Sequence, residues 1–88
     1  MFKVVIFNTN KVLFESEAWS VFLPGATGEF EVLEFHKTIL SLLKEGEIVV
    51  NGGEKKIPVK RGAVRMSGDT LVAAVEEAGA GNTTIEQA

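Results

Sequence analysis

The chain has 88 residues, of which 45% are hydrophobic, and it carries a formal net charge of −3 with a pI of about 5.1. This length predicts one domain, and the apolar content excludes a disordered chain. The absence of cysteine excludes disulfides and thiolate metal sites, the acidic balance without a basic stripe argues against nucleic acid, and no apolar run approaches the roughly 18 residues of a membrane-spanning helix.

Short runs of β-branched and aromatic residues alternate with turn residues along the chain. These runs predict strands over residues 2–7, 12–15, 18–23, 29–33, 48–50, 56–60, 63–67 and 70–75. The turns recur about every 8–12 residues, a spacing typical of a sandwich or barrel. The expected fold class is all-β: a small two-sheet β-sandwich or barrel of about eight short, mostly antiparallel strands.

Two segments, residues 38–44 and residues 77–88, are harder to assign to a secondary structure. Residues 38–44 fit either a short amphipathic helix or a buried extended segment, because a short apolar run has no decisive period. Residues 77–88 are polar and rich in glycine, so the domain is expected over residues 1–76 with a flexible C-terminal tail. Trp19 and the six phenylalanines are expected in the core.

Turn chemistry is clearest between residues 23 and 29. Pro24 fixes φ for a turn, and Gly25 and Gly28 permit positive φ where the backbone reverses. Gly46 ends segment 38–44 in either of its two forms. These residues predict a structural turn rather than a chemically active loop, because the phosphate-binding pattern of glycines followed by lysine is absent.

The residues that could carry chemistry do not form a catalytic set. His36 is the only histidine, with no nucleophile at a suggestive spacing and too few companions for a zinc site. Glu29, Glu31 and Glu34 are interpreted as a solvated strand face rather than a carboxylate pair. No catalytic residue, metal site or cofactor is therefore expected, and an all-β domain of this kind is interpreted as a binding or coupling element.

Residues 21–36, VFLPGATGEFEVLEFH, followed by residues 39–48, ILSLLKEGEI, resemble the epsilon subunit family of F-type ATP synthases. That family runs a strand into Leu-Pro-Gly, a glycine turn, a strand ending in Val-Leu, a histidine, an apolar stretch and Leu-Lys-x-Gly. Residues 59–66 and 70–75 are similar to two later strands of the family. The resemblance covers about residues 2–76, in order and with near-uniform spacing.

The chain also departs from the family pattern. Glu34 and Thr38 stand where proline is usual, Arg61 replaces a glycine, and Ala63 replaces a bulky aromatic residue. Family members often carry a C-terminal helical hairpin, which needs roughly 25 or more residues. The resemblance therefore implies the N-terminal β-sandwich domain in a short form without that hairpin.

For function, the resemblance implies a non-catalytic central-stalk (rotor) subunit that joins gamma to the c-ring and couples proton translocation to ATP synthesis. Its expected place is peripheral, on the cytoplasmic side of the inner (plasma) membrane, reached through the complex. By position, the family's ring-facing turn corresponds to Gly28, Glu29 and Phe30. Its gamma-facing segment corresponds to His36, Thr38, Leu40 and Ser41.

Simpler interpretations accompany these assignments. Without the resemblance, Glu29 is a solvated turn residue, Leu40 is a core residue and His36 caps a loop. The alternative function is a stand-alone β-sandwich module that binds a partner protein, for example by edge-strand addition. A β-sandwich that binds a small ligand or a carbohydrate is a further alternative. An enzyme is the least favoured alternative, because the sequence brings no acid–base pair together.

Overall fold

The computed structural model describes residues 1–34 and 38–77, and every regular element in them is a β-strand. The strands are β1 (Phe2–Phe7), β2 (Val12–Ala18), β3 (Ser20–Gly25), β4 (Gly28–Leu33), β5 (Ile39–Leu43), β6 (Gly46–Val50), β7 (Lys55–Ser67) and β8 (Thr70–Glu77). The all-β class with eight strands is thereby confirmed. None of the described segments is a helix with the length and apolar character needed to span a bilayer.

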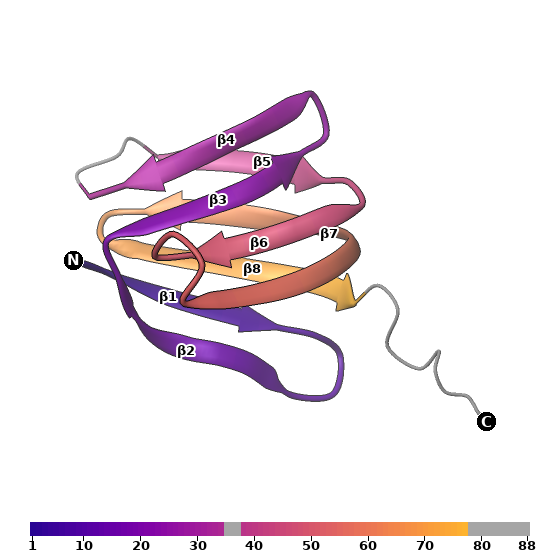
Figure 1. The fold of residues 1–88 in the computed structure, drawn as a ribbon, viewed down its shortest axis with the longest axis horizontal. Helices are drawn as coiled ribbons and strands as arrows, with labels where there is room; N and C mark the ends of the chain where they lie inside the picture. The colour runs from indigo at the N-terminus through magenta and orange to yellow at the C-terminus, as the bar shows by residue number, and fades with distance from the viewer. Residues whose placement is uncertain (35–37, 78–88) are drawn as a thin grey trace.

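The strands form two layers that share one strand. One layer has the order β2-β1-β8-β7-β5, and the other contains β4, β3, β6 and the first part of β7. In Figure 1, β3 and β6 lie in front of β8 and the second part of β7. All pairings are antiparallel except that of β1 with β8. Residues 2–7 are apolar on both faces of β1: Phe2, Val4 and Ile6 face the core, and Val5 and Phe7 lie half-buried on the outer side of the sheet.

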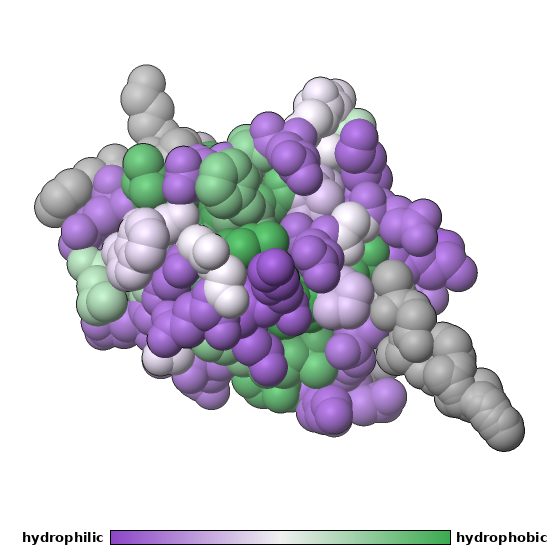
Figure 2. All heavy atoms as spheres, in the orientation of Figure 1, coloured by the Kyte–Doolittle hydropathy of each residue, from purple (hydrophilic) through white to green (hydrophobic). Residues whose placement is uncertain are grey.

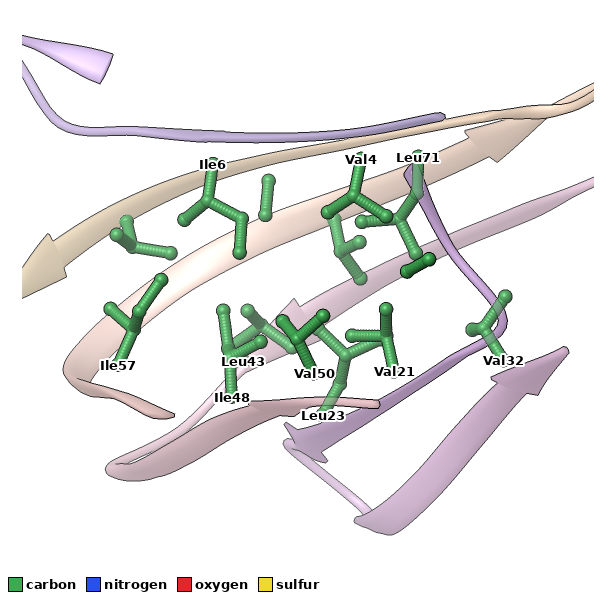
Figure 3. Packing of buried hydrophobic residues seen from close by; sticks show 14 of the residues in the cluster. Val4, Ile6, Val21, Leu23, Val32, Leu43, Ile48, Val50, Ile57 and Leu71 are labelled. Atoms are coloured by element: carbon green, nitrogen blue, oxygen red, sulfur yellow. The ribbon is translucent and has the colours of Figure 1, made fainter. Parts of the chain in front are cut away.

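The core lies between the two layers. Figure 3 shows Val4, Ile6 and Leu71 of the first layer pointing toward Ile48 and Val50 of the second. Alternation along each strand produces this arrangement, because every second side chain of a strand faces the same side. The other buried hydrophobic residues in the described part of the chain are Phe2, Ala18, Val21, Leu23, Val32, Leu43, Ile57, Val59, Val64, Met66, Ala73 and Val75.

Strand β7 merges two strands that were predicted separately, over residues 56–60 and 63–67. It runs without interruption through 13 residues, and its register with β8 shifts between Val59 and Arg61. A β-bulge bends a strand without ending it, which lets β7 pass from one layer to the other. Gly62 follows the bulge, where an added Cβ would lie 2.5 Å from the Ala74 carbonyl oxygen.

The expectation that Trp19 and all phenylalanines lie in the core is wrong. Trp19 is 53% exposed because its neighbours Ala18 and Ser20 are both buried, so the side chain between them faces outward. Phe22 is 41% exposed on the outer side of β3, and only Phe2 among the described phenylalanines is fully buried. Phe35 lies outside the described residues, as does the tail beyond Glu77.

Candidate interaction surfaces

The outer side of the layer β1-β8-β7-β5 carries two apolar rows, which we call the leucine face. The pairing registers place Leu40 beside Arg65, then Val72 and Val5, in one row. The second row consists of Leu42, Ala63, Ala74 and Phe7.

Two leucines stand out on this face. Leu40 is 79% exposed and Leu42 is 67% exposed, whereas Leu43 on the inner side of the same strand is buried. Single exposed apolar residues are ordinary, but a contiguous apolar area marks an interaction site. Leu42 adjoins Ala63 of β7, and its row continues through Ala74 of β8 to Phe7 of β1. This apolar row makes the leucine face suited to bind another protein.

The opposite side of the molecule is different. Figure 2 shows it over β3 and β6, where hydrophilic side chains surround smaller apolar patches. Glu31 on this side accepts a hydrogen bond at 2.6 Å from the hydroxyl of Ser20, which is the only buried polar residue among those the structure describes. This side also carries the exposed apolar residues Phe22 and Leu33, so polar and apolar side chains are mixed on it.

A second candidate surface lies where the β3–β4 and β5–β6 turns meet, and we call it the turn end (residues 26–29 and 44–45). Two backbone hydrogen bonds join the turns: the Ala26 N–H donates to the Leu42 carbonyl oxygen, and the Lys44 N–H donates to the Pro24 carbonyl oxygen, both at 2.9 Å. Such bonds hold the two turns as one unit. A rigid, polar end of this kind can present side chains to a partner without a large ordering cost.

Glycine and proline pack tightly at the turn end. A Cβ on Gly25 would lie 2.5 Å from the Gly28 carbonyl oxygen, and a Cβ on Gly46 would lie 2.6 Å from the Cβ of Pro24. The structural role expected for Pro24, Gly25 and Gly46 thus has a steric basis here. Gly25 was expected to permit a positive φ, but in this turn the positive φ, 141°, belongs to Gly28.

The residues matched to a ring-facing turn point in different directions. Gly28 and Glu29 are exposed at the turn end. Phe30 is half-buried and packs against the core, with its ring over Gly25. Of the three, Gly28 and Glu29 are therefore free to touch a partner.

The residues matched to a gamma-facing segment are also divided by the structure. Thr38 is exposed just before β5, and Leu40 lies on the leucine face, so its interpretation as a core residue is wrong. Ser41 is half-buried on the other side of the strand, where its hydroxyl donates to the Leu42 carbonyl oxygen at 3.1 Å. His36 lies outside the described residues.

Sequence reasoning missed most of the leucine face. Leu42 shares the face of Leu40, and Ala63, Val72 and Ala74 complete it from the neighbouring strands. The available signal was the spacing of two between Leu40 and Leu42, which becomes informative only once residues 38–44 are known to be a strand. No group of three or more metal-binding side chains occurs within residues 1–34 and 38–77.

Over residues 1–81, the chain matches the family described as the ATP synthase delta/epsilon chain β-sandwich domain. It is 35% identical over 81 residues to the ATP synthase epsilon chain of a Sulfurovum species, covering 89% of this chain and 63% of that protein. It is 37% identical over 79 residues to the epsilon chain of a Nitratiruptor species, covering 86% of this chain and 61% of that protein. The chain thus spans less than two thirds of the length of these curated relatives.

One chain in the solved structure of the central stalk and c-ring of the Tetrahymena thermophila mitochondrial ATP synthase has a similar fold. The TM-score is 0.73 at 11% sequence identity, and the match covers 85% of this chain and 63% of that chain. At this identity the likeness shows the fold alone, and it agrees with the two layers of strands described above.

Proposed function

Because the chain belongs to the family of ATP synthase delta/epsilon chain β-sandwich domains, we propose that it is a non-catalytic subunit of the central stalk of an F-type ATP synthase. In that role it joins gamma to the c-ring and helps to couple proton translocation to ATP synthesis. The observation that carries the proposal is the leucine face, an apolar sheet surface with Leu40 and Leu42 largely exposed.

Gamma is the partner proposed for the leucine face. Thr38 and Leu40 belong to the segment matched to the family's gamma-facing positions, and Leu40 lies among the exposed apolar residues of this surface. Covering the two leucines removes apolar area from water, which stabilises a complex by about 25 cal/mol per Å² before the costs of association. An interface of this composition resembles the apolar centre of a stable protein–protein contact.

The c-ring is the partner proposed for the turn end. Gly28 and Glu29 project there beside Lys44 and Glu45, all exposed. Charged and polar groups of this kind contribute to orientation and to the rate of encounter more than to raw affinity. The two proposed surfaces belong to one domain of packed sheets, and close packing makes such a body stiff enough to transmit a torque.

This role requires no bond chemistry in the chain itself. The proposed location is peripheral, on the cytoplasmic side of the plasma membrane, reached through the assembled complex. Support comes from the family membership.

Co-purification with gamma tests the proposal. The chain is expected to bind the gamma subunit of the same organism, and Leu42→Ser is expected to weaken that binding at least tenfold because it removes exposed apolar surface from the interface. Phe22→Ser is the matched control, since Phe22 is an exposed apolar residue (41%) on the opposite side. Equal loss for both variants, or no binding by the wild-type chain, would overturn the proposal.

A further inference from the structure

Arg65 is the one charged residue within the two apolar rows of the leucine face. It lies between Leu40 on β5 and Val72 on β8, and its side chain is exposed. An arginine at such a position covers apolar surface with its stem and presents a planar guanidinium group at the end.

Two ion pairs border this face. Arg61 in the middle of β7 pairs at 3.2 Å with Glu76 near the end of β8, and Lys3 pairs with Glu15 at 3.6 Å across β1 and β2. Arg65 has no ion pair within residues 1–34 and 38–77. The two rows therefore contain one positive charge that has no ion pair in the described part of the chain, although the whole chain has a net charge of −3.

Beside Arg65 the surface is hollowed. The hollow has a volume of about 280 Å³ and is lined by Arg65, Ser67, Thr70 and Val72. The lining of this small space is mostly apolar, although three of its four residues carry a polar or charged group. The Thr70 hydroxyl donates to the Asp69 carboxylate at 3.3 Å, so Ser67 and Arg65 are the donors that remain for a ligand among the described contacts.

Covering this face with a purely apolar partner would be unfavourable. An arginine charge that leaves water without a counter-charge is strongly destabilising, because its hydration is lost and nothing replaces it. An acidic side chain placed in the hollow would replace that hydration, since a carboxylate accepts two parallel hydrogen bonds from a guanidinium.

We propose that the partner covering the leucine face inserts an Asp or Glu side chain into the hollow beside Arg65, where its carboxylate pairs with the guanidinium. Arg65 is then the residue that sets the specificity of this interface, and the leucines supply most of its apolar area. The inference rests on the proposed function, because it takes the leucine face as the surface that gamma covers.

The test measures binding of purified gamma from the same organism to variants of the full chain, by calorimetry at low and moderate salt. Arg65→Met keeps the apolar stem and removes the charge, and we expect at least a tenfold loss of affinity. Arg65→Glu is expected to lose at least a hundredfold. Arg61→Met is the matched control on the same strand, expected to change affinity less than threefold because Arg61 already pairs with Glu76.

A second step identifies the acid. Each Asp and Glu of gamma is changed to Arg, and each gamma variant is tested for binding to the Arg65→Glu chain. One of these gamma variants is expected to bind that chain at least tenfold more tightly than wild-type gamma does. The absence of any restoring change would overturn the inference. Urea unfolding of each variant separates lost binding from lost folding, and the exposed position of Arg65 predicts an unchanged midpoint.

Failure of the inference and failure of the proposed function give different results. If Leu42→Ser weakens gamma binding while Arg65→Met does not, the leucine face is the interface and the carboxylate pairing is wrong. If neither variant weakens binding, the face itself is wrong. A concentration-dependent dimer that Leu42→Ser converts to monomer, with gamma unbound, would show that a second copy of this chain covers the face and would overturn the inference.

Discussion

Asn51 and Ser20, 31 residues apart in the sequence, bind each other reciprocally: the Asn51 N–H donates to the Ser20 carbonyl oxygen at 2.8 Å, and the Ser20 N–H donates to the Asn51 side-chain oxygen at 3.3 Å. The same side-chain oxygen accepts the Trp19 N–H at 2.8 Å. This contact fastens the corner between β2 and β3 to the turn between β6 and β7. Asn51 adopts a left-handed backbone with φ of 52°, which asparagine tolerates better than most residues.

Substitution of Asn51 should separate the contribution of its amide from that of its backbone. Asn51→Gly keeps the left-handed conformation but removes the acceptor, and we expect a loss of about 1–2 kcal/mol in the free energy of unfolding. Asn51→Ala should lose about 1 kcal/mol more, because a Cβ disfavours this conformation. Urea denaturation measures both values, and an alanine variant as stable as the glycine variant would contradict the backbone argument.

Gly46 should tolerate no side chain. The Cβ of an alanine there would lie 2.6 Å from the Cβ of Pro24, and neither atom can rotate away. Gly46→Ala is therefore expected to lower the free energy of unfolding by about 1–3 kcal/mol, as for other overpacked sites. The exposed neighbour Glu45→Ala is the control, with an expected change below about 0.5 kcal/mol. Thermal unfolding of both variants measures the difference, and equal midpoints would count against the steric explanation.

The fold was largely predictable because its determinants are local. Alternation of apolar and polar residues marked most strands, and the turns at Asn51-Gly52-Gly53 and Gly68-Asp69 fall between ranges that were predicted as strands, with Gly68 at a φ of 63°. The continuity of β7 was not predictable. Arg61 and Gly62 interrupt its apolar pattern, and only pairing with β8 on one side of the bulge and β6 on the other shows that the strand continues.

The leucine face was harder to predict because its signal depends on strand assignment. Residues 38–44 contain apolar groups on both sides, so neither a helix nor a buried strand could be preferred from the sequence alone. Leu40 was interpreted as core for the same reason. Its exposure follows from the register that places Leu40 opposite Arg65, on the side of β7 away from Val64 and Met66. Such register information comes from tertiary pairing, which one sequence does not contain.

Trp19 provides a direct optical test of the exposed corner. It is the only tryptophan of the chain and is 53% exposed, so its fluorescence in the folded protein should be quenched by acrylamide nearly as efficiently as in the unfolded protein. A tryptophan in the core would be protected several-fold. Strong protection in the isolated chain would contradict the outward orientation, and protection that arises only after gamma is added would place the corner at an interface.

Glu29 should affect assembly and leave folding unchanged. Its carboxylate is exposed at the turn end, and no ion pair holds it within the described part of the chain. Reversal of its charge is therefore expected to leave the free energy of unfolding within about 0.5 kcal/mol of the wild type. If the c-ring presents basic or amide groups to this end, Glu29→Lys should weaken retention of the chain by purified c-ring several-fold, and the effect should diminish as salt is raised.

Glu47→Lys is the matched control for that experiment. Glu47 is an exposed glutamate on β6, outside the turn end and paired across the strands with Pro58. The same change of charge at Glu47 should leave retention by the c-ring unaltered, since only the position differs. If both variants are retained at low salt as well as the wild-type chain, Glu29 does not contact the ring. If both variants lose retention equally, the effect comes from net charge, because either substitution changes the charge of −3 by two units.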